Sequence, residues 1–79
     1  MIIKILGTGC SKCQALEKDT INALAELNVA ADVQKVTKMD EIMKYDVMLT
    51  PALVINDKVK ASGKVLKIEE IKELIQQEV

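Results

Sequence analysis

The chain has 79 residues, 49% hydrophobic and 29% charged, with a net charge of −1, and we expect one domain spanning residues 1–79. The near-neutral charge, one aromatic residue and no histidine argue against nucleic-acid binding, because no basic excess is present to neutralise phosphates. No apolar run approaches the roughly 20 residues of a membrane span, and the first residues lack a signal-peptide pattern, so we expect a cytoplasmic protein without a membrane partner.

The first half of the chain predicts a strand, a helix and a second strand. Ile2–Leu6 is a β-rich run without regular polar alternation, which is typical of a central strand covered on both faces. Across Ser11–Leu27 the apolar residues recur at helical spacing, and Ser11 with Gln14 fits a capping box. Residues 31–36 alternate between apolar and polar side chains, which indicates a half-buried edge strand.

A short helix is expected next, from residue 38 to about residue 45, with Thr37 as its N-cap. Its spacing places Met39, Ile42 and Met43 on the inner face. We therefore expect these methionines to pack against the core rather than to bind copper.

The last part of the chain predicts a hairpin and a helix. Residues 52–55 form a buried strand, residues 56–58 a tight turn without the usual glycine, and residues 59–62 an antiparallel partner. A closing helix carries a stripe of Ile68, Ile71, Leu74 and Ile75.

The order of elements is therefore β-α-β-α-β-β-α. The strand–helix–strand unit requires a parallel strand pair, and the hairpin requires an antiparallel pair. A four-stranded mixed sheet flanked by three helices, with helices on both faces, satisfies both requirements and belongs to the α/β class.

The two cysteines of the chain, Cys10 and Cys13, lie where the first strand turns into the first helix. A C-x-x-C pair can exchange disulfides or bind a soft metal ion. Free backbone N–H groups at the helix start favour a thiolate at Cys10, and Lys12 adds a nearby cation. Cys13 lies one turn further and faces the core. This asymmetry makes Cys10 the attacking nucleophile and Cys13 the resolving thiol.

Three segments of the sequence resemble a known family. They are residues 7–13 (GTGCSKC), 45–55 (YDVMLTPALVI) and 59–65 (VKASGKV). Together with the element order, they resemble the small archaeal and bacterial "redox-active disulfide proteins", which have a thioredoxin-like fold of glutaredoxin size. The resemblance covers nearly the whole chain.

The resemblance implies a site built on two loops. Pro51 is then cis and lies against the cysteine pair, while Thr50 offers backbone groups to an extended partner chain. Cys10 attacks and Cys13 resolves. We expect the site to be shaped further by Thr8, Gly9, Ser11 and Lys12.

Two positions depart from related proteins. Thioredoxins carry a buried acid six residues before the first cysteine, whereas this chain has Lys4, which we expect to be a strand residue that extends its amine to solvent. Asp46 occupies a position where relatives often place a glycine.

The residues favour a dithiol–disulfide oxidoreductase. We expect it to act as a monomer on protein disulfides, to be restored by an upstream reductase, and to use a reversible Cys10–Cys13 disulfide with no cofactor and no metal ligand.

Other functions remain open at this point. Copper carriers also place a C-x-x-C after a first strand, so a Cu(I)-type carrier is the alternative, although such carriers end in a strand and this chain ends in an expected helix. A thioredoxin-like adaptor with dormant thiols is a third possibility, and the use of glutathione is compatible with the sequence.

Overall fold

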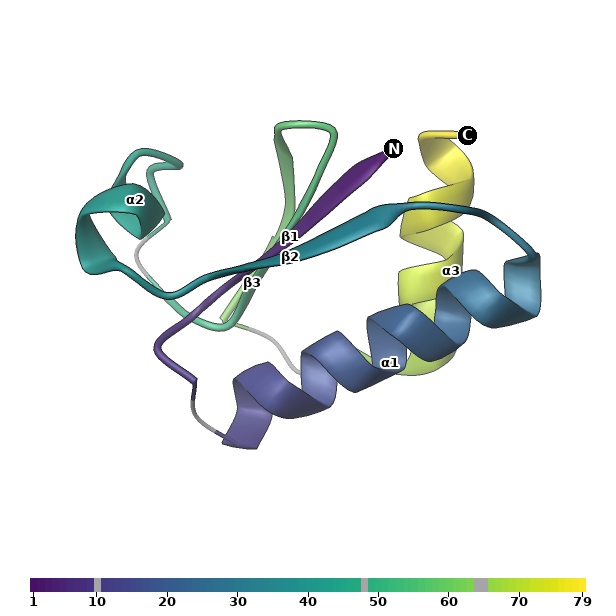
Figure 1. Cartoon of the computed structure of the whole chain (residues 1–79), viewed down its shortest axis with the longest axis horizontal. Coiled ribbons are helices and arrows are strands. Elements are labelled where there is room, and N and C mark those ends of the chain that lie inside the picture. The colour runs from purple at the N-terminus through teal and green to yellow at the C-terminus, as the bar shows by residue number, and fades with distance from the viewer. Residues whose placement is uncertain (10, 48, 64–65) are drawn as a thin grey trace.

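The computed structural model describes residues 1–9, 11–47, 49–63 and 66–79. Figure 1 shows the path of the chain. The described residues form seven elements: β1 (Ile2–Leu6), α1 (Ser11–Leu27), β2 (Asp32–Val36), α2 (Met39–Met43), β3 (Ala52–Ile55), β4 (Lys58–Ser62) and α3 (Ile68–Gln77). Within the described residues, no helix is long and apolar enough to cross a membrane.

The four strands form one mixed sheet in the order β2-β1-β3-β4. The β1 and β2 strands are parallel, whereas β3 runs antiparallel to both β1 and β4. The predicted α/β fold, with a four-stranded mixed sheet and three helices, is confirmed. The first strand and the first helix have the bounds that the sequence indicated, and β2 is an edge strand, as expected.

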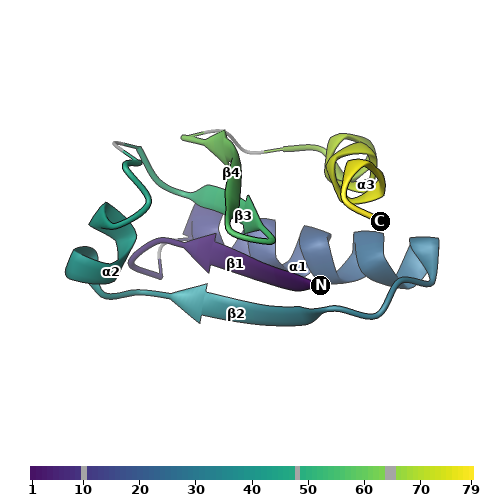
Figure 2. The same ribbon diagram turned by 90° about the horizontal axis from the view of Figure 1, so that it is seen from above.

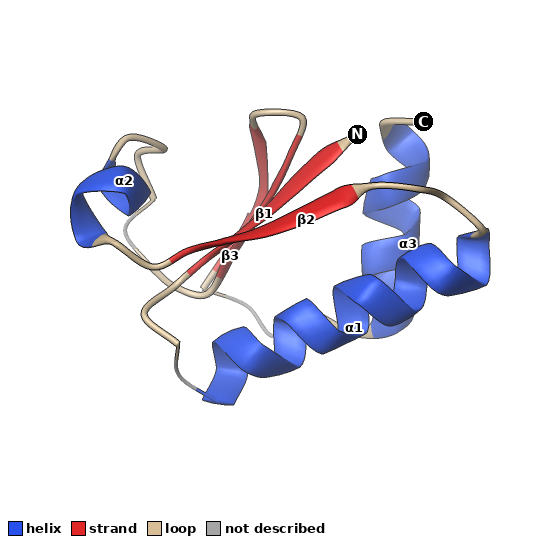
Figure 3. Cartoon of the chain, viewed as in Figure 1, coloured by secondary structure: helices blue, strands red, loops and turns tan. Residues whose placement is uncertain are grey.

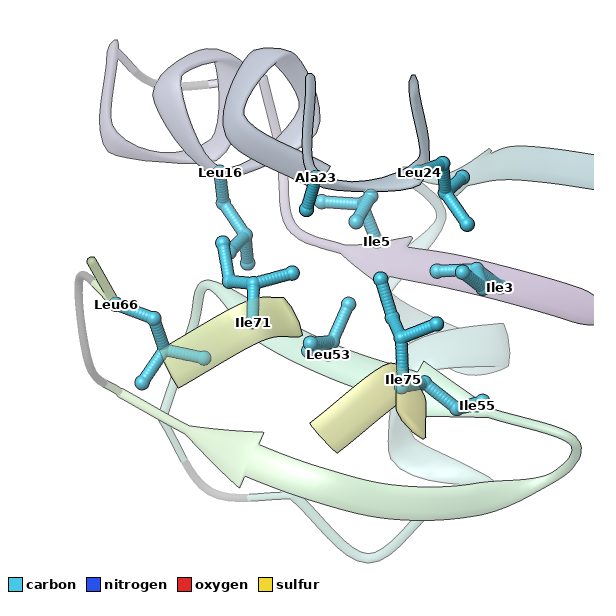
Figure 4. Close-up of a cluster of buried hydrophobic side chains, with 10 residues drawn as sticks. All are labelled: Ile3, Ile5, Leu16, Ala23, Leu24, Leu53, Ile55, Leu66, Ile71 and Ile75. Atoms are coloured by element: carbon cyan, nitrogen blue, oxygen red, sulfur yellow. The ribbon is translucent and has the colours of Figure 1, made fainter. Parts of the chain in front are cut away.

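One face of the sheet packs against the two long helices. Figure 3 shows α1 and α3 on the same side of the sheet, and Figure 4 shows the side chains between the layers. Alternate residues of the central strands point into this layer because strand side chains alternate between faces. The cluster consists of Ile3, Ile5, Leu16, Ala23, Leu24, Leu53, Ile55, Leu66, Ile71 and Ile75. We call this side the α1/α3 face.

The opposite side of the sheet, here the α2 face, is covered much less. Figure 2 shows α2 at one end of the sheet, next to the ends of β1 and β2. The buried cluster on this side consists of Leu6, Val36, Ile42, Ala52 and Val54. Ile2, at the far end of β1, remains 46% exposed.

The α2 helix differs from its prediction. Its buried residue is Ile42, whereas Met39 and Met43 are 57% and 64% exposed, so the expected inner face is wrong for both methionines. The α2 helix lies at one end of the sheet, and only the Ile42 side of its single turn is covered. Its N-cap is Lys38, without a side-chain cap, rather than the predicted Thr37.

Three turns use left-handed backbone at polar residues, and the first of them is at Asn28, just after α1, with a φ of 55°. Asn56 and Asp57 have φ values of 51° and 65°, which matches the hairpin turn that usually contains glycine. Asp46 has a φ of 57°, which explains why a glycine also suits this position. Asparagine and aspartate tolerate this conformation better than other side chains do.

Candidate active site

Cys13 lies in the first turn of α1, on the side of the helix that packs against the sheet. Its side chain is only 6% exposed. The apolar spacing of α1 places Cys13 in line with Leu16 and Thr20, which are also buried. The prediction that Cys13 faces the core is therefore confirmed. Cys10 and its predicted role lie outside the described residues.

The Cys13 sulfur packs directly against the backbone of Gly7. A Cβ atom on Gly7 would overlap the Cys13 Sγ and would lie 3.3 Å from the Cys13 Cβ. The same atom would lie 4.0 Å from the Cα of Pro51, so the sulfur, the Gly7 backbone and Pro51 meet at one point. The sequence alone gives Gly7 no role beyond following the first strand. A glycine at a buried strand end, six residues before a core-facing cysteine, was the available signal.

The remaining predicted residues of this loop line its exposed rim. Thr8, Gly9, Ser11 and Lys12 are all exposed. Gly9 has a φ of 90°, a conformation that side chains rarely adopt, and its carbonyl accepts a hydrogen bond of 3.3 Å from the Gln14 Nε2. This bond links the loop to the first turn of α1.

The second loop of the site carries Thr50 and Pro51. The peptide bond between them is cis, and Pro51 is buried while Thr50 is exposed. The Gly63 N–H donates a 2.9 Å hydrogen bond to the Pro51 carbonyl, and the Ser62 Oγ donates a bond of the same length to the Leu49 carbonyl. The loop is thus fastened on the end of β4, and Thr50 is left accessible beside Pro51.

A small pocket of about 100 Å³ leads to Cys13 from the side of β2. Its lining residues come from β1, α1 and the end of β2. They are Ile5, Gly7, Gly9, Cys13, Gln14, Lys35 and Thr37. The pocket therefore connects the buried thiol to the edge of the sheet, on the side away from Thr50.

Lys4 does not take the place of a buried acid near the sulfur. Its Nζ donates a 2.7 Å hydrogen bond to the Tyr45 hydroxyl and lies 4.0 Å from Asp57 Oδ1. The bond with Tyr45 raises the pKa of Lys4 above its ordinary value. Ile5 points into the α1/α3 face, so its neighbour Lys4 points into the α2 face, on the opposite side of the sheet from Cys13.

The chemistry that the described part of the site offers is that of a buried thiol beside an accessible loop. Within residues 1–9, 11–47, 49–63 and 66–79, no three His, Cys, Asp or Glu side chains are grouped so as to hold a metal ion.

Comparison with known proteins gives a consistent result. The profile of the thioredoxin domain family matches residues 1–76 of this chain. The chain is similar to a thioredoxin of Methanothermobacter thermautotrophicus, with 39% identity over 75 residues that cover 95% of this chain and 97% of that protein. It is also similar to a thioredoxin of Methanocaldococcus jannaschii, with 38% identity over 73 residues that cover 92% and 84% of the two chains.

Proposed function

Because this chain belongs to the thioredoxin domain family, we propose that it is a thiol–disulfide oxidoreductase that reduces protein disulfides through Cys10 and Cys13. The observation that carries the proposal is the packing of the Cys13 sulfur on the Gly7 backbone next to Pro51. A buried second thiol beside an accessible loop suits a resolving cysteine, which must reach the first sulfur and no other.

The reaction proceeds in two exchanges. The Cys10 thiolate attacks one sulfur of the substrate disulfide, and the other substrate sulfur leaves as a thiolate that takes up a proton. Cys13 then loses its proton and attacks the Cys10 sulfur, which closes the Cys10–Cys13 disulfide and releases the second substrate thiol. Two electrons pass from the dithiol to the substrate, and an upstream reductase returns two electrons to the Cys10–Cys13 disulfide. In this cycle the chain itself uses no bound cofactor.

The substrate is proposed to bind as an extended chain along the loop that precedes β3. Thr50 is exposed there, and its backbone can pair with an extended peptide. Leu49 is 63% exposed, so it offers an apolar contact next to the paired segment. We propose that the protein works as a monomer in the cytoplasm. In that compartment a close cysteine pair serves redox chemistry more often than structure.

Reduction of insulin by the purified protein, with a chemical reductant in excess, tests the proposal. We expect the wild-type protein to accelerate the reaction, Cys10→Ser to abolish the acceleration, and Cys13→Ser to accumulate a mixed disulfide that mass spectrometry detects. A wild-type rate equal to that of both variants, with several reductants, would rule the proposal out.

The copper-carrier alternative receives less support, because the chain belongs to the thioredoxin domain family. Titration of the reduced protein with Cu(I) separates the two functions. Tight binding of one equivalent, together with no disulfide exchange, would reverse our preference.

A further inference from the structure

A second pocket lies on the α2 face, where Lys4 leaves the sheet on the side opposite Cys13. Its volume is about 300 Å³, at the small end of the range for ligand-binding sites. Residues of β1 and β2 form its floor, and α2 with the residues that follow it forms its wall. The charged and hydrogen-bonding side chains of the lining are Lys4, Gln34, Lys35, Glu41, Lys44 and Tyr45.

Lys4 lies in the floor of this pocket. It belongs to the central strand β1, opposite Gln34 of β2 and Val54 of β3. An ammonium group can donate three hydrogen bonds, and among the described residues it donates one, of 2.7 Å, to the Tyr45 hydroxyl. Asp57 Oδ1 is 4.0 Å away, which is too far for a hydrogen bond, and its side chain is 84% exposed. Lys4 therefore keeps donor capacity for a ligand.

Three further donors line the same space. The Tyr45 oxygen accepts the bond from Lys4, so the proton of this hydroxyl points away from the ammonium and can be donated. The Gln34 Nε2 uses one of its two N–H groups on Asp32 Oδ2, at 2.8 Å, and keeps the other. Lys44 is exposed just after α2 and brings a second ammonium to the rim. The pocket thus combines donors from the sheet and from the α2 segment.

The charge of the lining favours an anion. Among the described residues that line the pocket, three lysines face one glutamate, a surplus of two positive charges in a chain of net charge −1. Lys35 is shared with Glu17 of α1, at 3.5 Å, so Lys4 and Lys44 are the principal cations. Glu41 is exposed, and solvent screens the repulsion that it exerts on an anion.

We propose that this pocket binds a small phosphate monoester, whose phosphate lies between Lys4, Tyr45 and Lys44. Two ammonium groups match the charge of about −2 that such a phosphate carries near neutral pH. Hydrogen bonds between an ammonium and a phosphate oxygen are among the strong ones, and Tyr45 adds a neutral donor. The volume exceeds that of a phosphate group, which leaves room for the organic part of the ester. Binding is non-covalent and involves neither cysteine.

Titration of nitrogen-15-labelled protein, followed by NMR at constant ionic strength, tests the proposal. The probes are glycerol 3-phosphate, inorganic phosphate and acetate. We expect saturable shifts of the backbone signals of residues 34–36 and 44–45. Glycerol 3-phosphate should bind at least as tightly as inorganic phosphate, and about tenfold more tightly than acetate, which carries a single charge.

Substitutions assign the binding to the pocket. We expect Lys4→Met to weaken binding of glycerol 3-phosphate about tenfold, and Tyr45→Phe, which keeps the ring and removes the donor, about threefold. Glu41→Gln should strengthen binding, because it removes the opposing charge. Lys18→Met removes a lysine charge from an exposed site of α1 outside the pocket and should change nothing. Should Lys4→Met fail to fold, the exposed substitution Lys44→Met decides the matter, with a similar loss expected.

Several results would overturn the proposal. They are shifts that do not saturate, acetate binding as tightly as glycerol 3-phosphate, tighter binding of inorganic phosphate than of the ester, or equal losses in Lys4→Met and Lys18→Met. The outcome is independent of disulfide exchange, because Cys10→Ser protein should bind the ester as the wild type does. A protein that reduces insulin but shows no saturable shifts would reject the phosphate site alone.

Discussion

Among the described residues, the α1/α3 face of the sheet buries a cluster of ten hydrophobic residues, and the α2 face buries a cluster of five. The larger cluster is closed by two helices of several turns, whereas the smaller one is closed by a five-residue helix and leaves room for the polar pair of Lys4 and Tyr45. Cys13 belongs to the larger side. The comparison shows that the side of the sheet with the larger buried cluster is also the side on which α1 places Cys13, while the other side accommodates a charged lysine.

Truncation of one isoleucine on each face is the most direct test of this difference. Ile71 of α3 and Ile42 of α2 are 0% and 2% exposed, so both side chains are fully removed from water. We expect Ile71→Ala to lower the free energy of unfolding by about 4 kcal/mol and Ile42→Ala by about 2 kcal/mol, because the neighbours of Ile42 can relax into the space. Urea denaturation measures both values, and equal losses would show that the faces contribute alike.

A methyl group on Gly7 probes the point where the sulfur meets the sheet. We expect Gly7→Ala to cost about 2 kcal/mol in unfolding free energy, since the new Cβ overlaps the Cys13 Sγ. In a Cys13→Ala background the same change should cost much less, because the overlapping atom is gone. Gly9→Ala is the control: nothing lies within 4 Å of its Cβ, so its strain of about 1 kcal/mol should not depend on Cys13.

Acid should weaken the α1/α3 face through Glu78. The bond from Lys60 at 2.8 Å, followed by that from Lys58, lowers the pKa of Glu78 below its ordinary value. The stabilisation is therefore present at neutral pH and is lost as the pH falls through the lowered pKa. We expect Glu78→Gln to be slightly less stable than wild type in urea at neutral pH and equal to it in acid. Glu73→Gln, which changes an exposed acid of α3, should show no such convergence.

Alkali should weaken the α2 face through Lys4, by the smallest amount. Because Tyr45 raises the pKa of Lys4, this stabilisation is present below the ordinary lysine pKa and is lost as the pH rises through the raised one. We expect Tyr45→Phe to lose less stability than Ile42→Ala at neutral pH, in urea denaturation. The double variant with Lys4→Met should be no worse than either single variant; additive losses would show that the two side chains act separately.

Much of the fold could be predicted from periodicity. The spacing of apolar residues in α1 and the alternation in β2 reflect burial against a large partner, and such burial repeats along an element. The buried face of the short helix α2 could not be predicted in this way, because a helix of about one turn shows no repeat of apolar residues. Nothing in the spacing of Met39, Ile42 and Met43 distinguishes the single residue that the sheet covers.

The two loops of the candidate site were predictable from the sequence, but the contacts between them were not. The C-x-x-C spacing and the Thr50-Pro51 pair pointed to the two loops that approach each other. Gly7 is required because a side chain there would overlap the Cys13 sulfur, which belongs to a residue six positions later. Lys35 lines the pocket next to Cys13 because of the register between the parallel strands β1 and β2. Both are properties of the assembled sheet, which local sequence does not carry.

The pairing of β3 with β4 shifts by one residue between Leu53 and Val54. Val59 lies opposite Val54 and Ala61 lies opposite Leu53, with Lys60 between the two pairs. The hairpin is therefore in frame on both sides of an added residue, as in a β-bulge. In evolutionary terms, the bulge is a place where the chain could lose one residue without changing the buried pairs of the hairpin. A homologue lacking Lys60 would keep Ala61 opposite Leu53 and would lose one of the two lysines that pair with Glu78, while Lys58 would remain.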